Sequence, residues 1–269
     1  MINIFRKKSP TIRFFSLSPG VNTLYPIIKS GKLDRPWISE EKKDYESRKS
    51  KCPFASILNG NLPIGGVHSV GKCPAIQNIM SSGFIVRAPA DFSVQTNGDG
   101  SSVNLRYRNI LPHIEYVTKH EEEVSSWLLD SSKDVTLKQV IKINTPWRIV
   151  CDSDDIVFLV TKVPFVKEPR FTAVMGILDP KTAYEINIQL FWHILDGEEV
   201  IKAGTPLCNY IPVSRSLLQS INFTSEDATE IDYNVEREMT FSYDHVFPNL
   251  NTITDRISRV KKILKKYYG

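Results

Sequence analysis

The sequence lacks any apolar run near the roughly 20 residues that a bilayer-spanning helix needs. Its four cysteines are scattered without a Cys-x-x-Cys pair, and its first residues do not follow the pattern of a signal peptide. These absences argue against a membrane protein and against a small disulfide-bonded scaffold. We therefore expect reduced thiols and a soluble protein made in a cytoplasm.

A strong charge of one sign is missing as well. The 269 residues include 34 basic and 30 acidic side chains, and the formal net charge of +4 is too small to indicate nucleic-acid binding by itself. The cations gather at the two ends of the chain, at Arg6–Lys8 and again after Asp255. The hydrophobic content of 41% and the charged content of 24% are ordinary, so the composition predicts a folded globular chain.

The stretch from Ile141 to Arg215 contains the clearest structural pattern. It holds five short apolar runs, rich in Val, Ile, Phe and Thr, that Pro, Gly and Asp residues separate. This spacing predicts an antiparallel β-barrel or sandwich, and the alternation from Tyr184 to Trp192 predicts a half-buried strand. We expect one β core that includes Trp147, Val157, Leu159, Ile177, Ile186, Ile188, Leu190 and Ile211.

The composition divides the chain into three expected parts. Residues 1–50 contain one strand-like run, Thr11–Leu17, and then many Pro and Gly residues among aromatic ones, which predicts an extended N-terminal arm packed on a surface. Residues 51–215 are expected to form the β core domain, and residues 216–269 a helical extension. The charge run Glu40–Lys51 is interpreted as a solvated short helix or loop, with a partner-binding patch as the alternative.

The end of the chain predicts an amphipathic helix. Apolar residues recur there at helical spacing, and cations crowd its C-terminal end, where the helix dipole favours them. Three interpretations stay open: the helix docks on the β core, packs against another subunit or virion protein, or binds nucleic acid or an anionic membrane. The apolar positions are Ile253, Ile257, Val260, Leu264 and Tyr267.

Two polar stretches hold residue types that can do chemistry. Asn97–Gly100 is a glycine-rich tip that could cradle phosphate, but a strand rather than a helix is expected to follow, so we interpret it as a hairpin turn. His113, His120 and Glu121–Glu123 could act as acids, bases or metal ligands, yet nothing in the sequence orients them toward one another. We interpret this second stretch as a solvated loop with one helical turn.

Cys52, His68 and Cys73 are residue types that bind zinc. Their spacing matches no standard zinc module, and a fourth ligand is not evident. We interpret them as free thiols and a loop histidine, and we expect neither a metal nor another cofactor.

Several motifs occur in an order that resembles an uncharacterised protein family of tailed phages and some bacteria. The resemblance covers about residues 70 to 215 and implies a viral origin, with no established activity. It also implies phage or host proteins as partners, in the host cytoplasm or the virion, with a homo-oligomer as one arrangement and no membrane or nucleic-acid partner. The motifs are Lys72–Ile76, Gly83–Val86, Pro89–Asp91, Asn144–Trp147, Gly176–Asp179, Lys202–Pro206 and Ile211–Arg215.

A more distant likeness is to the β-clip core of trimeric dUTP pyrophosphatases. In those enzymes a Gly-apolar-apolar-Asp turn precedes a Tyr-containing strand, and Gly176–Asp179 and Tyr184 are similar to that arrangement. The likeness implies that Asp179 orients a hydrolytic water, that Tyr184 lines the base, and that Arg215 lies near phosphates held by magnesium. The chain departs from the pattern, because Tyr184 lies two residues too far from the Asp and both the Arg-Ser-Gly motif and the glycine-rich C-terminal arm are missing.

Two hypotheses of function follow. The first is a non-enzymatic phage protein, either a virion structural or accessory component or a host-interaction factor, that acts through protein–protein contacts. The alternative is a dUTPase-like nucleotide-binding protein or nucleoside triphosphate hydrolase. For Asp179 a plain turn, made with Pro180, is the competing interpretation, and for Arg215 a surface position.

Overall fold

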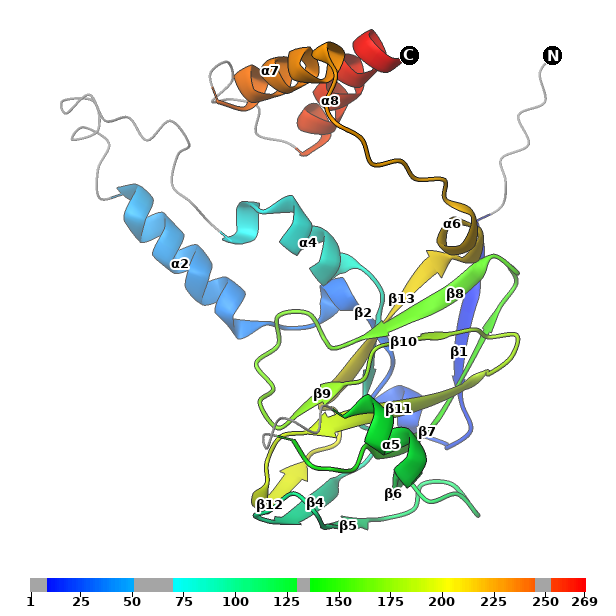
Figure 1. Ribbon diagram of the computed structural model, residues 1–269. Coiled ribbons are helices and arrows are strands. Elements are labelled where there is room, and N and C mark those ends of the chain that lie inside the picture. The colour runs from blue at the N-terminus through cyan, green and yellow to red at the C-terminus, as the bar shows by residue number, and fades with distance from the viewer. Residues whose placement is uncertain (1–8, 51–69, 130–135, 245–252) are drawn as a thin grey trace. The chain divides into compact units, whose positions relative to one another are not determined.

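The computed structural model describes residues 9–50, 70–129, 136–244 and 253–269, and it is mainly β, with several antiparallel sheets and a C-terminal helix (Figure 1). The chain separates into two compact units. The β unit comprises residues 1–34 and 79–221, and the helical unit comprises residues 35–78 and 222–269. These boundaries differ from the expected ones, because the start of the expected arm belongs to the β unit.

Sheet A has β7 at its centre. Residue pairs such as Phe14 and Ile149 set the antiparallel register of β1 on β7, which confirms the strand expected at the start of the chain. The strand order is β1 (Ile12–Ser16), β7 (Ile141–Cys151), β11 (Glu185–Trp192) and β9 (Phe171–Ala173), and β6 (Val117–Lys119) also pairs with β7.

Sheet B has β13 at its centre and β10 at one edge. All its neighbouring strands are antiparallel. The strand order is β10 (Gly176–Leu178), β8 (Ile156–Thr161), β13 (Pro206–Ser214), β3 (Phe84–Arg87) and β2 (Ile28–Lys29).

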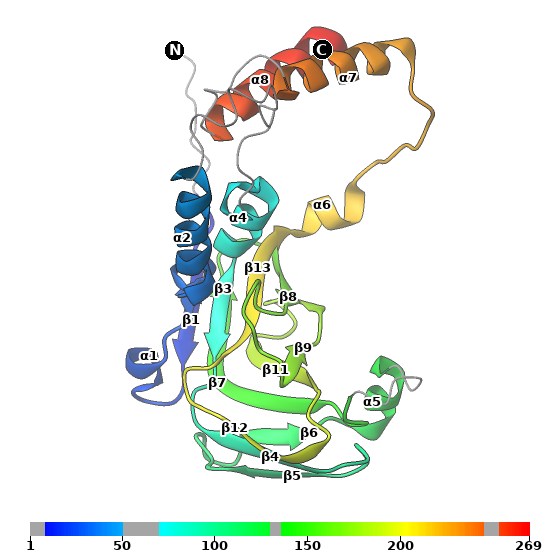
Figure 2. The same cartoon turned by 90° about the vertical axis from the view of Figure 1, so that its left-hand side faces the viewer.

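Sheet C consists of β12 (Asp196–Ile201), β4 (Phe92–Asn97) and β5 (Val103–Tyr107). Figure 2 shows it at the end of the β unit where β3 leads into β4 and β12 leads into β13. The β4–β5 connection is the expected hairpin turn, and Gly98 and Gly100 adopt φ values of 95° and 69° that side chains disfavour.

The core of the β unit forms where sheets A and B meet. The Phe14 ring of β1 lies 5.1 Å from the Phe84 ring and 6.4 Å from the Phe158 ring, both of sheet B. Alternate residues of β11 are buried, as the alternation in the sequence predicted. The expected core residues Trp147, Val157, Ile186, Ile188 and Leu190 are buried, and Leu159 and Ile211 are half-buried.

Ile177 is the exception, because 58% of it is exposed. It lies on the edge strand β10, where its neighbour Leu178 points to the core, so Ile177 points to the opposite face. The prediction that Ile177 belongs to the core was wrong.

The prediction of an extended arm with little regular structure was also wrong. Residues 20–50 contain α1 (Val21–Leu24), β2, a 3₁₀ turn η1 (Ser30–Lys32) and the long helix α2 (Pro36–Ser50). Pro36 fits the first turn of a helix, and the charge run after it is rich in Glu and Lys, which favour helices. The charge run is helical as far as Ser50, as one of its interpretations expected, and Lys51 lies outside the described residues. The partner-binding alternative stays a prediction.

The other helices divide between the two units. The short helices α5 (Glu122–Leu128) and α6 (Arg215–Ser220) belong to the β unit, and α5 accounts for the helical turn expected there. The 3₁₀ turn η2 (Val70–Lys72) belongs to the helical unit, and α4 (Pro74–Ser81) spans the boundary. The helical unit ends in α7 (Glu230–Asp244) and α8 (Ile253–Tyr268), so the C-terminal helix is confirmed.

Candidate functional site

Two motifs that lie far apart in the sequence meet in the β unit. The Asp91 carboxylate accepts a hydrogen bond from the backbone N–H of Ala203 at 2.7 Å and lies 3.0 Å from Nζ of Lys202. Backbone hydrogen bonds join Ala88 to Gly204 and to Thr205 beside it, each at 2.8 Å. Asp91 therefore holds the turn between β12 and β13, and the Ala203 N–H, followed by the Lys202 ammonium, lowers the pKa of its carboxyl.

Gly204 in this turn has a structural reason to be glycine. Its φ is 89°, and a Cβ added there would lie 3.3 Å from the Tyr25 ring. The turn thus combines a left-handed backbone with the close approach of an aromatic ring. These motifs, which carry the family resemblance, serve the fold of the β unit.

Two of the candidate site residues, Asp179 and Arg215, form an ion pair with each other. The Asp179 Oδ2 atom lies 2.7 Å from the Arg215 Nη2 atom, and Asp179 Oδ1 accepts the backbone N–H of Lys181 at 3.0 Å. Arg215 also donates from Nε to the carbonyl of Asp154 at 3.2 Å. The Arg215 contact, followed by the Lys181 N–H, lowers the pKa of the Asp179 carboxyl.

This arrangement makes Asp179 a poor proton acceptor. A general base works best when its pKa lies near the working pH, and each Asp179 oxygen already accepts a contact from a donor on the chain. Backbone hydrogen bonds from Thr182 and Ala183 to the Asp179 carbonyl complete a turn. The geometry fits the plain-turn interpretation better than the catalytic one.

A second carboxylate secures the start of α6 next to this ion pair. Asp155 accepts the backbone N–H of Ser216 and the hydroxyl of Ser214, each at 2.8 Å. The Ser214 hydroxyl in turn accepts the N–H of Leu217 and caps the helix. The end of β13 is therefore a rigid polar junction.

Tyr184, the third expected site residue, is 52% exposed and lies beside Arg148 rather than in a closed site. Its ring centre is 5.8 Å from the Arg148 guanidinium, which is a cation–π distance. Arg148 is 4% exposed, donates to the carbonyls of Thr145 and Trp147, and contacts Glu185 at 3.1 Å. Sequence reasoning missed this buried arginine, although it directly follows the Asn144–Trp147 motif.

The zinc candidates are placed only in part. Cys52 and His68 lie outside the described residues, and Cys73 is a half-buried free thiol. Within residues 9–50, 70–129, 136–244 and 253–269, no group of three or more His, Cys, Asp or Glu side chains is arranged to hold a metal ion. The expected absence of a metal stays a prediction.

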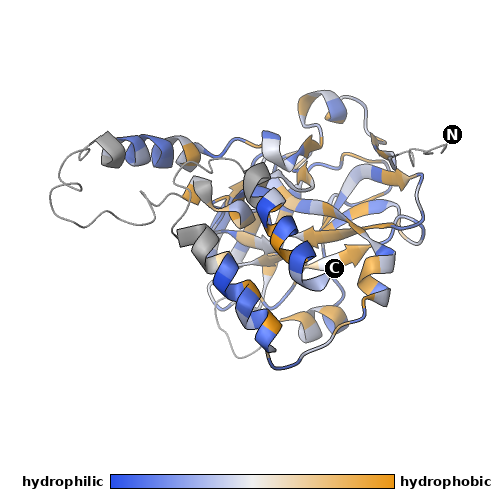
Figure 3. Cartoon of the chain, turned by 90° about the horizontal axis from the view of Figure 1, so that it is seen from above, coloured by the Kyte–Doolittle hydropathy of each residue, from blue (hydrophilic) through white to orange (hydrophobic). Residues whose placement is uncertain are grey.

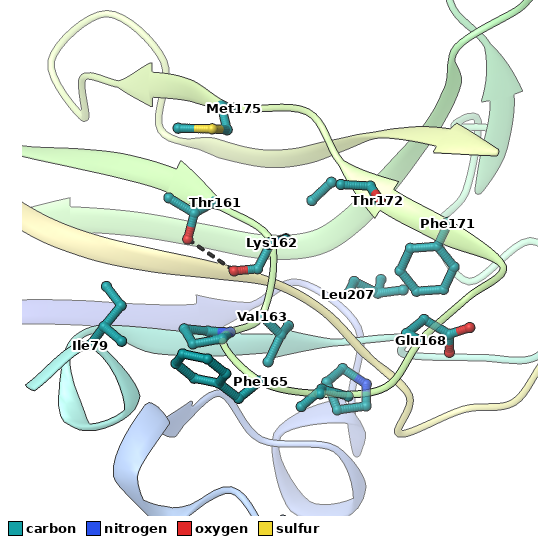
Figure 4. Close-up of a pocket in the computed structure, with 14 residues that line it drawn as sticks. Ile79, Thr161, Lys162, Val163, Phe165, Glu168, Phe171, Thr172, Met175 and Leu207 are labelled. Carbon is teal, nitrogen blue, oxygen red and sulfur yellow. Dashed lines mark hydrogen bonds between the residues drawn. The ribbon is translucent and has the colours of Figure 1, made fainter. Parts of the chain in front are cut away.

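An apolar groove of about 550 Å³ opens in the β unit near the edge strands β9 and β10. Figure 4 shows Leu207 of β13 in the middle of its lining, with Met175 on one side and Phe165 on the other. The loop between β8 and β9 forms one wall, and Phe171 and Ala173 of β9 contribute another. Of its fourteen lining residues ten are apolar, so the groove fits an apolar ligand.

Three of the four polar side chains that line the groove, those of Thr161, Glu168 and Thr172, have hydrogen-bond partners. Glu168 makes two hydrogen bonds with the Arg170 guanidinium, at 2.7 and 2.6 Å, and the Thr172 hydroxyl lies 2.8 Å from Nε2 of His193. Burial lowers the pKa of His193, which favours its neutral form near pH 7. Apart from Lys162, the groove therefore offers an incoming ligand shape and apolar surface rather than charge.

Two large apolar side chains at the groove, those of Phe165 and Met175, are exposed to solvent. Phe165 has a φ of 54°, a left-handed conformation that bulky residues rarely adopt, and its side chain is 45% exposed. Met175 is 69% exposed. Backbone strain of this kind persists where the surrounding structure holds it and clusters at binding sites.

Sequence reasoning missed this groove. The apolar run from Ile156 to Val163 was interpreted as one strand, but β8 ends at Thr161, and Val163–Val166 lie in the loop that walls the groove. The signal was present in Pro164, which is disfavoured inside a central strand and so marked the end of β8.

Comparison of the chain with protein-family models and with curated proteins finds no match. Among the helices of the described residues, none combines the length and apolar character needed to cross a membrane.

Proposed function

We propose that this protein works without catalysis and binds a partner protein through the apolar groove beside β9 and β10. The observation that carries the proposal is the groove itself, where apolar side chains from three segments surround an open volume and where Thr161, Glu168 and Thr172 of the wall are already hydrogen-bonded. A short apolar segment of a partner, with one aromatic or aliphatic side chain as its anchor, matches this lining. Burying exposed Met175 and Phe165 against such a segment removes apolar surface from water.

The polar candidates support the same view. Asp179, the carboxylate that the dUTPase likeness assigns to water activation, is bonded to Arg215, the residue that the likeness assigns to phosphates. Asp179 lies in the turn after β10 and Arg215 begins α6, and the two charges form an ion pair with each other. A hydrolase of that kind would instead present them to a nucleotide and its magnesium ion.

The phage-family resemblance supplies the setting for this activity. In that setting the protein is a virion structural or accessory component, or a factor that contacts host proteins, in the virion or the host cytoplasm. The finer fold proposal is a β-clip-like sandwich, and the packing of sheet A on sheet B through Phe14, Phe84 and Phe158 supports it.

A selection of random peptides tests the groove without knowledge of the natural partner. Short peptides are selected on the purified protein alone and are then titrated against the variant Met175→Asp, which places a charge at the groove. We expect enriched peptides that share apolar or aromatic residues and bind the variant about tenfold more weakly or worse, a loss of about 1.4 kcal/mol. Failure to enrich any peptide, or enrichment of peptides that bind Met175→Asp equally well, would overturn the proposal.

A nucleotide assay separates this proposal from the enzymatic alternative. We expect no hydrolysis of dUTP or related nucleoside triphosphates by the purified protein in the presence of magnesium. Turnover that Asp179→Ala abolishes while the circular dichroism spectrum is unchanged would establish the hydrolase instead.

A further inference from the structure

Helices α7 and α8 pair as an antiparallel hairpin within the helical unit. Asp232 near the start of α7 accepts a hydrogen bond from the hydroxyl of Tyr268 at the end of α8. Further along α7, Glu238 accepts the Tyr267 hydroxyl at 2.6 Å and forms an ion pair with Lys266. These polar contacts fix which faces of the two helices meet.

The start of α7 is capped by a reciprocal pair. The Asp232 carboxylate accepts the backbone N–H of Thr229 at 2.8 Å, and the Thr229 hydroxyl accepts the N–H of Asp232 at 3.4 Å. The hydrogen bonds from Thr229 and then from Tyr268 lower the pKa of Asp232 to about 2. Hydrogen bonds therefore join the start of α7 to the end of α8 and fix this end of the hairpin.

The hairpin leaves much of its apolar surface uncovered. Among its described side chains only Val235 and Ile263 are buried. Ile257 and Leu264, which lie seven residues apart and so share one face of α8, are 49% and 41% exposed, and Ile231, one turn before Val235, is 50% exposed. In Figure 3 the ribbon of α8, which leads to the C-terminus, changes repeatedly between hydrophilic and hydrophobic residues. Two helices of this length cannot bury both of their apolar faces against each other alone.

The charges of the two helices are opposite. The sequence of α7 holds five carboxylates and one arginine, whereas that of α8 holds six cations and one carboxylate. Lys261 and Lys265 border the uncovered stripe of α8, since Lys261 lies four residues after Ile257 and Lys265 lies next to Leu264. Such a surface is complementary to a copy of itself turned by a twofold rotation, because the basic helix of each copy then meets the acidic helix of the other.

We propose that α7 and α8 form a self-association element, in which the hairpins of two copies of this chain pack as a four-helix bundle. Each α8 lies on the α7 of the other copy, so that Ile257 and Leu264 are buried and the opposite charges face each other. This proposal is independent of the groove, which lies in the β unit.

The same charges disfavour a polyanionic partner. A protein that binds nucleic acid or an anionic bilayer needs a strongly positive surface, and the carboxylates of α7 offset most of the cations of α8. Lys266, one of those cations, is already paired with Glu238. A second copy satisfies both signs of charge at once.

The first test measures the mass of the purified full chain by sedimentation equilibrium over a series of concentrations. We expect a dimer for the unaltered protein and a monomer for the double variant Ile257→Asp/Leu264→Asp. The matched control is Trp127→Asp on α5, which also places a carboxylate at an exposed apolar residue, here 90% exposed, and should leave the dimer intact. A monomeric unaltered protein would overturn the proposal, as would a dimer that the double variant leaves unchanged.

A charge-reversal test remains informative if the apolar variant loses its helices. One variant carries Lys261→Glu/Lys265→Glu and a second carries Glu230→Lys/Glu236→Lys. Each alone should dimerise at least about tenfold more weakly, because like charges then face each other, and a mixture of the two should form a heterodimer. Self-association of either variant at the unaltered strength, or a mixture that forms no heterodimer, would show that another surface or another partner covers this face.

Discussion

The apolar groove and the Asp179–Arg215 pair lie in the same β unit but differ in the kind of surface that they expose. At the pair, a charged carboxylate and a guanidinium bond to each other and to nearby backbone groups. At the groove, Met175 and Phe165 expose apolar surface around an open volume. Asp179 and Arg215 therefore stabilise the fold, although their residue types suggested a catalytic site. At the groove, in contrast, contact with a partner would bury exposed apolar surface, which is favourable.

The largest expected effect is on the free energy of unfolding, and it compares a buried residue of the groove wall with an exposed one. Phe171→Ala should lower the free energy of unfolding by about 3 to 5 kcal/mol, because Phe171 is 5% exposed and stacks on Trp192. Phe165→Asn should change it by only about 0.5 kcal/mol, since Phe165 is half exposed and Asn tolerates a left-handed backbone. Urea denaturation of both variants provides the measurement. Equal losses would mean that Phe165 is a core residue and that the groove wall is not a separate surface.

The next effect concerns binding rather than stability. Phe165→Asn should weaken the selected peptides by about tenfold while the midpoint of urea denaturation stays near that of the unaltered protein. Leu24→Asn, at a residue that is 68% exposed in the same unit but does not line the groove, is the matched control and should bind normally. Fluorescence anisotropy with labelled peptide distinguishes the two outcomes. If the control binds as weakly as Phe165→Asn, the peptides do not occupy the groove.

A smaller effect is expected at the ion pair. Asp179→Ala should lower the free energy of unfolding by about 1 kcal/mol, because the pair is partly exposed, with 20% of the Asp179 side chain and 29% of the Arg215 side chain accessible. Arg215→Ala should cost a similar amount, and the double variant should cost less than the sum of the two. Additive losses in this double-mutant cycle would show that the two side chains do not stabilise each other.

The smallest effect is a dependence on pH. The pKa of Asp179 in the folded protein is lowered below its unfolded value of about 3.9 by Arg215 and by the Lys181 N–H. Its contribution to stability is therefore fully present above about pH 4 and is lost as the pH falls through the folded-state pKa. Stability curves of the unaltered protein and Asp179→Asn should converge in acid. Curves that stay parallel down to acid pH would contradict a lowered pKa.

The sequence predicted the features that depend on local periodicity. The alternation in β11 and the Asn97–Gly100 turn each arise from neighbouring residues, and both are present as expected. The C-terminal helix is also present; its buried residue is Ile263, whereas Ile257 and Leu264 of the expected apolar stripe are exposed. Which face of a helix is buried depends on its partner, and a stripe alone does not specify that partner.

The features that depend on tertiary contacts were not predictable in the same way. The exposure of Ile177 follows from the position of β10 at a sheet edge, and the groove follows from a loop that leaves β8 after Thr161. Asp179 and Arg215 were both singled out, but the distance of 2.7 Å between them is a property of the folded chain. Their role as partners was therefore visible only once the turn after β10 and the end of β13 were placed.

One binding measurement compares the two regions most directly. The peptide selected on the unaltered protein is titrated against that protein, Met175→Asp and Asp179→Ala, all at the same pH and salt concentration. The account predicts equal dissociation constants for the unaltered protein and Asp179→Ala, and a value at least about tenfold larger for Met175→Asp. Binding that survives Met175→Asp but is lost in Asp179→Ala, with the fold intact, would contradict it and place the functional surface at the ion pair.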